Sequence, residues 1–349
     1  MLARNSDLEG AATAIRSLEK QFNRWFQYHI IFLNDQPWEQ DFISALTAAS
    51  SASLSFEIIP PSMWSYPAHI DQPHALKCMA AQKAKGLPYA DLESYHHMCR
   101  FNSGPLFSHP ALLPYDWYWR IEPDVTFTCA ITYDPFRFMR QHNKTYGYTI
   151  ALWEVGSTCP SLFRTTTTYR EAHLSHLSTS PLWTSMLDAS WAPLPLRRLL
   201  MPHLLHSRDR KGDAWNFCHF WSNFEIASLA FFRSDAYRAY FEALDAAGGF
   251  YYERWGDAPV HSLAAAMLLE PRQVHWFRDF GYSHPPFQQC PRNAVRAGQL
   301  PGSEVLGTGS WNEETQQVGG IGCRCECDPD VGRVPSECID RLRQSVDIE

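Results

Sequence analysis

Apolar residues form two kinds of pattern along the first part of the chain. Between residues 7 and 26 they return every three to four positions, which predicts an amphipathic helix. Residues 28–33 and 54–59 are short, continuous apolar runs, which are typical of strands, and a helical pattern at residues 39–49 separates them. Strand, helix and strand in this order predict an α/β fold built on a mostly parallel, twisted sheet flanked by helices.

The later part of the chain continues this alternation. Further strands are predicted by aromatic and β-branched runs at residues 117–121, 146–152 and 250–255. Further helices are predicted where an N-capping residue precedes an apolar period, after Ser234 and after Asp257. Residues 170–213 are rich in Ser, Thr and Pro, and they predict a surface excursion.

Composition and charge exclude several classes of protein. The chain has 349 residues, of which 45% are hydrophobic, and this is enough for one large globular domain. The net charge is −7, and no run of five or six like charges indicates a nucleic-acid-binding surface. No run of about 18 apolar residues predicts a membrane span, and the first residues lack the apolar core of a signal peptide.

The ten cysteines point to an oxidising compartment. Four of them crowd the tail, as Cys323, Cys325, Cys327 and Cys338. This spacing is not typical of a zinc knuckle, so disulfides are favoured over a metal site, with reduced thiols as the alternative. Disulfides imply an oxidising lumen. The first residues do not read as a signal peptide, so the two observations conflict unless an N-terminal anchor precedes this sequence.

A pair of acids stands where the strand at residues 117–121 should end. Glu122 and Asp124 flank Pro123, which cannot donate to a sheet ladder. Carboxylates at the carboxyl edge of a sheet can hold a hard divalent cation. A solvated turn with two exposed carboxylates is the structural alternative.

Further acids and histidines lie in aromatic surroundings. Glu225 stands at the start of an apolar run that has helical character, and burial among aromatic rings should raise its pKa and suit it to catalysis. The alternative is an acid at a helix start. Asp257 has the position of an N-cap, Glu253 and Arg254 suggest a structural ion pair, and His261 taken alone is more typical of a hydrogen-bonded core residue.

Five segments together resemble one known family. They are Ser94-Tyr-His-His-Met-Cys-Arg100, Tyr118-Trp-Arg-Ile-Glu-Pro-Asp124, His219-Phe-Trp-Ser-Asn-Phe-Glu-Ile226, the run Gly248 to Ser262, and Gly281-Tyr-Ser-His-Pro-Pro-Phe287. In this order they resemble the fungal α-1,2-mannosyltransferases of glycosyltransferase family 15, from Arg4-Asn5 to the cysteine-rich tail.

This resemblance implies a GT-A type fold stapled by disulfides, in one catalytic domain over residues 1–349. Residues 1–125 would form the nucleotide-binding half, residues 126–290 the acceptor-binding and catalytic half, and residues 291–349 a cysteine-rich tail. It also implies a retaining enzyme that uses GDP-mannose and Mn²⁺ to extend a terminal mannose of a glycoprotein glycan. Such enzymes are type II proteins of the Golgi lumen, attached to the membrane only through an anchor that this sequence would lack.

The resemblance also assigns roles residue by residue. Glu122 and His284 would hold the metal, and carboxylate with imidazole suits Mn²⁺. Asp124 would help to bind the donor nucleotide. Tyr95 would lie near the donor sugar, as a donor-binding and catalytic residue. The catalytic pocket would be formed by Glu225, as the proposed nucleophile, and by Asp257. Arg100 is a further candidate, as a bidentate donor to the diphosphate.

Two other functions remain open from the sequence. A glycoside hydrolase would use Glu225 with Asp257 or Glu253 and would need neither a nucleotide nor a metal. A catalytically silent member of the family would bind mannosides without turnover.

Overall fold

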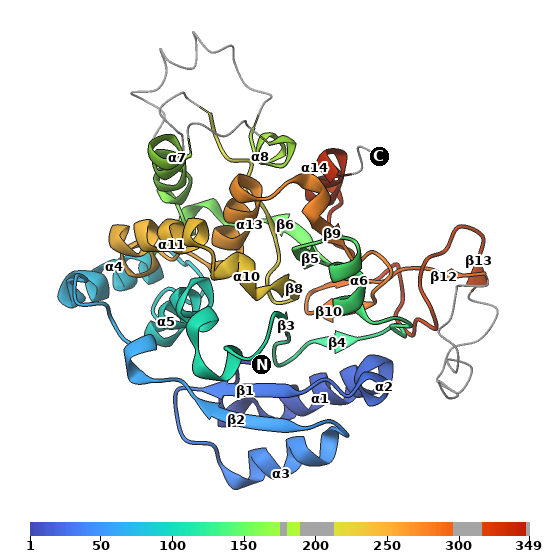
Figure 1. The fold of residues 1–349 in the computed structure, drawn as a ribbon. Coiled ribbons are helices and arrows are strands. Elements are labelled where there is room, and N and C mark those ends of the chain that lie inside the picture. Colours follow the sequence, from blue (N-terminus) through green and yellow to red (C-terminus); the bar gives the residue numbers. More distant parts are fainter. Residues whose placement is uncertain (175–179, 189–212, 296–315, 347–349) are drawn as a thin grey trace.

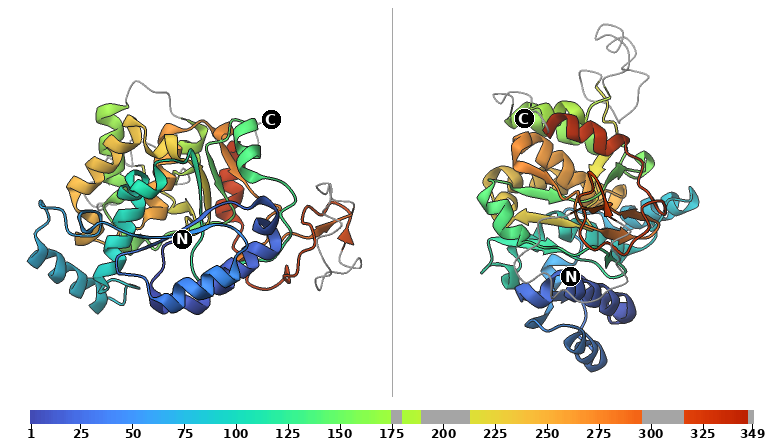
Figure 2. Two further views of the ribbon diagram at one scale, coloured as in Figure 1. Left: turned by 60° about the horizontal axis from the view of Figure 1, so that its bottom comes forward. Right: turned by 90° about the vertical axis from the view of Figure 1, so that its right-hand side faces the viewer.

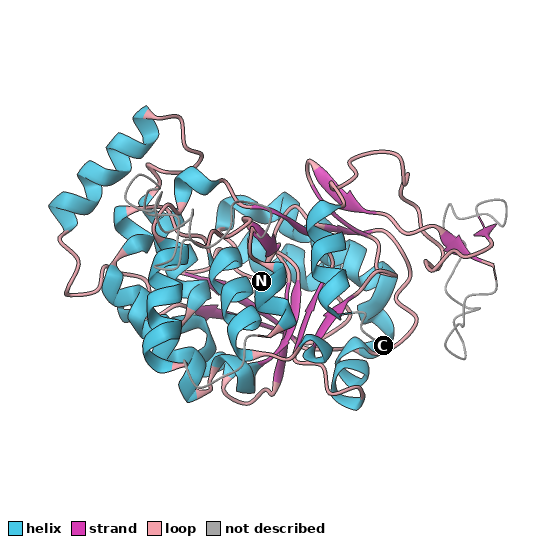
Figure 3. Cartoon of the chain, turned by 90° about the horizontal axis from the view of Figure 1, so that it is seen from above, coloured by secondary structure: helices cyan, strands magenta, loops and turns pink. Residues whose placement is uncertain are grey.

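The computed structural model describes residues 1–174, 180–188, 213–295 and 316–346. Most of the excursion predicted at residues 170–213 therefore lies outside the described residues. Within the described ranges the chain is a mixed α/β structure in which strands form a layer beside a thick group of helices (Figure 3).

The N-terminal segment confirms the predicted β-α-β unit. The helical stretch runs without a break through α1 (Leu8–Leu18), a π-helical turn (Glu19–Asn23) and α2 (Arg24–Phe26). Strand β1 (Ile30–Asn34), helix α3 (Gln40–Ala49) and strand β2 (Leu54–Ile58) follow. β1 and β2 are parallel, with Ile30 opposite Leu54, and they form a two-stranded sheet at one end of the molecule (Figure 1).

A second sheet forms the centre of the molecule. Its strands are β3 (Trp117–Arg120), β8 (Glu225–Ser228), β5 (Tyr146–Tyr148) and β9 (Val274–Trp276), in this spatial order. β8 is antiparallel to both of its neighbours, and only β5 and β9 are parallel. The expected single, mostly parallel sheet is thus wrong for the described residues, whose strands form five separate sheets, and the four-stranded central sheet is mostly antiparallel.

Several short strands surround this centre. β6 (Ala151–Trp153) pairs with β7 (Cys218–Phe220). β10 (Tyr282–His284) lies between β4 (Thr126–Phe127) and β11 (Phe287–Gln289), and β12 (Asn293–Ala294) pairs with β13 (Gln316–Gln317).

Helices lie on both sides of the central sheet (Figures 1 and 3). The longer ones are α4 (Gln72–Ala84), α5 (Glu93–Ser103), α7 (Leu162–His173), α11 (Asp235–Ala247), α13 (Asp257–Leu268) and α14 (Glu337–Val346). The shorter ones are α6 (Pro135–Gln141), α8 (Pro181–Ser185), α10 (Leu229–Phe232) and α12 (Gly249–Tyr252). Helices α5, α11 and α13 lie on one side of the sheet, and α6 and α14 lie on the other. Single 3₁₀ turns lie at Asn5–Asp7, Pro61–Met63, Pro105–Ser108, Pro110–Leu112, Gly156–Thr158 and Pro271–Gln273.

Two local predictions are wrong. The run after Glu225 is strand β8 before it becomes the one-turn helix α10, because β3 pairs along its full length. Residues 250–255 are not a strand, since α12 occupies their first half. The capping predictions for α11 are confirmed: the Ser234 hydroxyl accepts from the Tyr237 N–H, and Gly248 ends the helix with a φ of 73°.

Three disulfides tie the tail to the body of the protein, as the cysteine count predicted. They join Cys129 to Cys325, Cys218 to Cys338, and Cys290 to Cys327. The remaining four cysteines, Cys78, Cys99, Cys159 and Cys323, are free thiols. In the part of the chain that the structure describes, no helix has the length and apolar character that crossing a membrane requires.

Candidate active site: a buried carboxylate cluster

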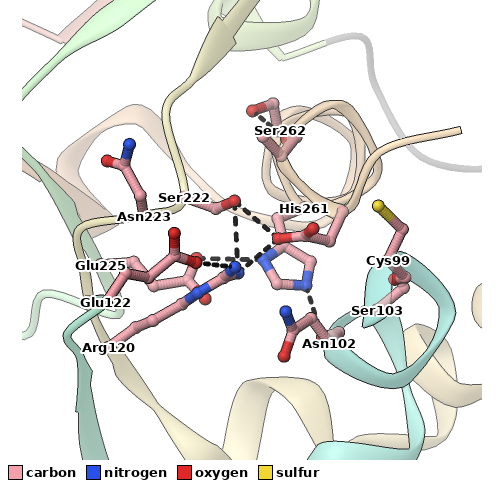
Figure 4. Close-up of polar contacts among 12 residues, drawn as sticks. Cys99, Asn102, Ser103, Arg120, Glu122, Ser222, Asn223, Glu225, His261 and Ser262 are labelled. Atoms are coloured by element: carbon pink, nitrogen blue, oxygen red, sulfur yellow. Dashed lines mark hydrogen bonds and ion pairs between the residues drawn. The ribbon is translucent and has the colours of Figure 1, made fainter. Parts of the chain in front are cut away.

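Two neighbouring strands of the central sheet carry the charged side chains of the site. Arg120 ends β3 and Glu225 begins β8, and the antiparallel register places them directly opposite each other. Side chains at opposite positions project to the same face of a sheet, so the cation and the anion share one environment. Figure 4 shows this cluster beside helix α13, from which His261 projects.

Glu225 is completely buried and has three hydrogen-bond donors. The Tyr118 hydroxyl donates to Oε1, the Tyr146 hydroxyl donates to Oε2 at 2.7 Å, and His261 Nδ1 lies 3.0 Å from Oε2. A carboxylate offers about four lone-pair positions, so three donors leave about one for another partner.

These donors decide the ionisation of Glu225. Burial raises its pKa, but His261, Arg120 and the Tyr118 hydrogen bond lower it by more, and the net shift is downward. The expected upward shift is therefore wrong, because it considered burial without the three donors. The structure holds Glu225 as a carboxylate at neutral pH.

His261 links this carboxylate to helix α5. Its Nδ1 faces Glu225, and its Nε2 lies 3.1 Å from the backbone carbonyl of Asn102. The ring is therefore held between the Glu225 carboxylate and a backbone carbonyl. The predicted role of a hydrogen-bonded core histidine is confirmed, and its partner is the candidate nucleophile.

Arg120 connects three carboxylates. Its guanidinium donates to Asp257 and to Glu122, and it also lowers the pKa of Glu225. Ser222 donates to the same Asp257 oxygen as Arg120, at 2.7 Å. Burial raises the pKa of Asp257, but Arg120, His261 and Ser222 together lower it further, so Asp257 is also an anion at neutral pH.

The local position of Asp257 differs from the prediction. It is the first residue of α13, and the capping position belongs to Gly256, which makes no side-chain cap. The Asp257 carboxylate is directed instead to Arg120 and Ser222. Asp257 therefore places a negative charge in the cluster and does not cap helix α13.

Glu122 and His284 approach the cluster from the β3 end and from β10. The pairing of β10 with β4 sets Ser283 opposite Thr126, so His284 follows next to the turn that contains Glu122. The His284 ring packs against Trp221, with centroids 4.9 Å apart, and Trp221 immediately precedes Ser222 in the chain.

The donor chemistry of these two residues fits a divalent cation. His284 Nδ1 lies 3.2 Å from the carbonyl of Pro285, so donation there leaves the Nε2 lone pair for a metal, an arrangement common among metal-binding histidines. Among the described residues no group of three or more His, Cys, Asp and Glu side chains could hold a metal. A metal at Glu122 and His284 would thus take its other ligands from substrate and water.

Tyr95 lies in the same neighbourhood. Its hydroxyl accepts a hydrogen bond from Arg254 at 2.9 Å, and burial first, with Asp257 among the other contributors, raises its pKa well above the ordinary value. The predicted ion pair of Glu253 with Arg254 is wrong, because Arg254 pairs with Glu154 at 3.6 Å.

Two predicted residues make their contacts elsewhere. The Arg100 guanidinium donates two hydrogen bonds, of 2.7 and 2.9 Å, to the Asp245 carboxylate. Because this pairing uses its bidentate donors, the structure gives no support to a diphosphate contact. Asp124 adopts a left-handed conformation with a φ of 68° and is exposed. Its carboxylate lies so close to Gly10 of α1 that a Cβ there would be 2.1 Å from Oδ1.

The sequence reasoning missed Arg120, Tyr118 and Tyr146 as members of the site. Tyr118 and Arg120 are two positions apart, so a strand carries both on one face, and this period was available from the sequence. No local signal could have found Tyr146, because it reaches Glu225 only through the pairing of β5 with β8.

Comparisons with known proteins show the family to which the chain belongs. The sequence profile described as glycolipid 2-alpha-mannosyltransferase matches residues 1–299. The O-glycoside alpha-1,2-mannosyltransferase homolog 4 of Schizosaccharomyces pombe is 40% identical, over 96% of this chain and 73% of its own length. Alpha-1,2 mannosyltransferase KTR1 of Saccharomyces cerevisiae is 41% identical, over 83% of this chain and 68% of its own length.

Solved structures give the same result. Core-mannan synthase A of Aspergillus fumigatus, in its Mn/GDP form, superposes with a TM-score of 0.81 at 35% identity, and covers 100% of this chain and 84% of its own. The mannosyltransferase Ktr4p of S. cerevisiae, in complex with GDP, gives a TM-score of 0.80 at 32% identity, with 100% and 81% covered.

The fold matches that of solved mannosyltransferases, and the chain is a glycosyltransferase. The chain belongs to the glycolipid 2-alpha-mannosyltransferase family, glycosyltransferase family 15, and is an α-1,2-mannosyltransferase. The family membership predicted from the five motifs is confirmed.

Proposed function

We propose that this enzyme moves mannose from GDP-mannose to a terminal mannose of a glycoprotein glycan, with Mn²⁺ and with retention at the anomeric carbon. One observation carries the chemical part of the proposal: Glu225 is a fully buried carboxylate with a lowered pKa, held by three donors. The donor and the ion are inferred from the related structures, one of which is in a Mn/GDP form and the other in complex with GDP.

The residues divide the work as follows. Glu122 and His284 would hold the metal, which when bound would neutralise charge on the leaving diphosphate. Tyr95 contacts the donor sugar at the same end of the site. Glu225 presents negative charge to the mannosyl carbon as it becomes electron-poor, either by attacking it or by stabilising it until the acceptor hydroxyl arrives on the same face.

The surrounding network keeps Glu225 ready for this role. Its donors fix the carboxylate before substrate arrives, so no side chain has to reorient as charge develops. Asp257 and Arg120 hold each other in place beside Glu225 by forming an ion pair. Asp124 supports the metal end of the site only indirectly, through the turn that carries Glu122.

The glycoside hydrolase alternative lacks a proton donor. A hydrolase of this kind needs one carboxyl group kept protonated as the general acid. The pKa values of Glu225 and Asp257 are both lowered, and the Glu253 carboxylate accepts from Trp255 Nε1 at 2.6 Å and from a backbone N–H. Neither Glu225 nor Asp257 is therefore held as an acid, and the Glu253 carboxylate is engaged by two N–H donors.

We also propose that the enzyme works in the Golgi lumen, where it would be joined to the membrane by a segment outside this sequence. The three disulfides support an oxidising compartment. Residues 1–125 would contribute the nucleotide side of the domain, and residues 126–290 would contribute the acceptor side.

The test is transfer from radiolabelled GDP-mannose to a panel of α-mannosides. Glu225→Gln keeps the size of the side chain and removes its charge, so transfer should fall by about 10²-fold or more. The matched control, Glu242→Gln, changes an exposed glutamate of α11 and should leave transfer unaffected. No transfer by the wild-type protein to any mannoside would refute the proposal, as would equal activity of the two variants.

The metal ligands have a readout besides activity. Glu122→Ala and His284→Ala should each raise the Mn²⁺ concentration needed to increase the melting temperature in the presence of GDP. Retention is checked by the anomeric configuration of the new linkage in the product. A mannosyl group found on the peptide that carries Glu225 would establish direct attack, and binding of mannosides without turnover would identify a silent member instead.

A further inference from the structure

The turn between α6 and β5 contains a sequence pattern that the catalytic site does not use. Asn143, Lys144 and Thr145 form the pattern Asn-x-Ser/Thr with a residue other than proline in the middle, and no other asparagine of the chain has Ser or Thr two positions later. In secreted proteins this pattern accepts an N-linked glycan on a surface loop. So short a pattern also arises by chance, and the geometry of the turn therefore has to support it.

Asn143 presents a side chain that the protein itself does not use. The residue is exposed and has a left-handed backbone with a φ of 50°, just after helix α6. The turn is closed by the Lys144 N–H, which donates to the Met139 carbonyl at 2.8 Å. Asparagine tolerates this backbone, and its side-chain amide makes no hydrogen bond with any described residue. The amide nitrogen is thus available to a reagent in solvent.

The other two residues of the pattern fix the turn in place. Lys144 Nζ donates to the Arg272 carbonyl at 2.8 Å, and the Thr145 N–H donates to the Gln273 carbonyl at 2.6 Å. The Thr145 hydroxyl accepts from Gln273 Nε2 at 3.3 Å. These bonds do not involve the Asn143 side chain, so a group attached to its amide would break no contact of the folded protein.

The surroundings of the turn leave room for a bulky, hydrated group. Arg137, Arg140, Gln141 and His142, which precede Asn143, are all exposed. Helix α6 lies at the surface of the molecule in Figures 1 and 2. An oligosaccharide at the end of this helix would extend into solvent, as surface glycans do.

The same turn lies away from the catalytic end of the central sheet. The Ser228 N–H donates to the Thr145 carbonyl at 2.9 Å, so the pattern enters β5 beside the last residue of β8. Glu225 is the first residue of β8 and lies opposite Arg120. The four residues of β8 span about 10 Å. A glycan on Asn143 would therefore leave the carboxylate cluster accessible.

We propose that Asn143 is an N-glycosylation site, an inference that rests on the lumenal compartment proposed above. The glycan donor is an oligosaccharide linked to a lipid diphosphate, and a separate transferase of the secretory pathway catalyses the step. The Asn143 amide nitrogen forms a bond to C1 of the first sugar and loses one proton. The bond from C1 to the diphosphate oxygen breaks, and the lipid diphosphate leaves with the electron pair.

The experiment secretes the full chain from eukaryotic cells behind a cleavable signal peptide. Mass spectrometry of the wild-type peptide that contains Asn143 should show one oligosaccharide, and peptide-N-glycosidase should remove it and leave aspartate at position 143. Asn143→Gln and Thr145→Val should both lose the glycan, whereas Thr145→Ser, which keeps the hydroxyl, should retain it. A wild-type peptide that is mostly unmodified would overturn the proposal, as would a glycan that persists in Asn143→Gln. If one of the two glycan-free variants is not secreted, the other decides the point.

Activity tests the placement of the glycan and separates this inference from the proposed function. Mannosyl transfer by the folded enzyme should stay within about 2-fold when the glycan is removed enzymatically. A loss of more than about 10-fold would contradict a position away from the carboxylate cluster. A secreted, disulfide-bonded and active enzyme with an unmodified Asn143 would refute the glycosylation site and leave the proposed function standing. A glycosylated protein without transfer to any mannoside would support the site and refute the proposed function.

Discussion

The ion pair between Arg120 and Asp257 gives the sharpest test of how the cluster is held. Both side chains are largely buried, with 11% and 7% exposure. Arg120→Met keeps most of the side-chain length and removes the charge, which leaves Asp257 and Glu122 without their cation. Removing one partner of a buried pair costs about 3–5 kcal/mol. This is a large part of the roughly 5–15 kcal/mol that stabilises a domain.

The pH dependence separates charge from packing. In the wild-type protein the folded pKa of Asp257 lies below its ordinary value, so its ionisation stabilises the fold at neutral pH, and this contribution is lost as the pH falls through that pKa. In Arg120→Met burial dominates, and the ionised Asp257 destabilises the fold. The gap in unfolding free energy between the two proteins should therefore widen between about pH 4 and pH 7.

Urea unfolding at a series of pH values measures this gap. Arg238→Met is the control, because Arg238 is 62% exposed and its partner Asp235 is 96% exposed, so its loss should cost less than about 0.5 kcal/mol. Adding Asp257→Asn to Arg120→Met should restore part of the lost stability. A gap that is the same at pH 4.5 and pH 7.5, or equal midpoints for Arg120→Met and the wild type, would refute the electrostatic account.

Two further predictions concern stability away from the cluster. Burial and nearby cations lower the pKa of His275 to about 4, so unfolding free energy should fall as the pH drops from about 6.5 to 4, by roughly 3 kcal/mol in all. His275→Gln should flatten this slope in urea titrations, and an unchanged slope would contradict the assignment. Cys338→Ala opens the bond to Cys218 and should cost about 2–5 kcal/mol, read as a lower melting temperature, while Cys78→Ala, at a free thiol, should cost little.

Local signals predicted the parts of the fold that depend on nearby residues. The apolar period over residues 7–26 and the β-α-β unit after it are correct, because each is set within about 25 residues of chain. The cap at Ser234 and the stop at Gly248 are correct for the same reason.

Short buried runs were harder to predict. Residues 226–232 are mostly apolar, and such a short run does not distinguish a strand from a helix. Only the long-range pairing with β3 makes its first half a strand. The separation of the β1–β2 sheet from the central sheet could not be read from sequence either, since it depends on which strand edges lie together.

The sequence identified the acids of the site as candidates, but it did not predict whether they are ionised. Glu122, Glu225 and Asp257 were identified as candidates from their aromatic surroundings and from the family motifs. The direction of the Glu225 pKa depends on Tyr118, Tyr146 and His261, which come from three separate elements. Only the assembled structure brings these donors together.

The bond between Cys218 and Cys338 sets an order for maturation of the chain. Strand β7 is made 120 residues before its covalent partner. At about 5–20 residues per second, roughly 6–24 s of synthesis separate the two thiols. During that interval Cys218 is open to the wrong partner, and so an oxidoreductase that can undo early pairings should increase the yield of active enzyme.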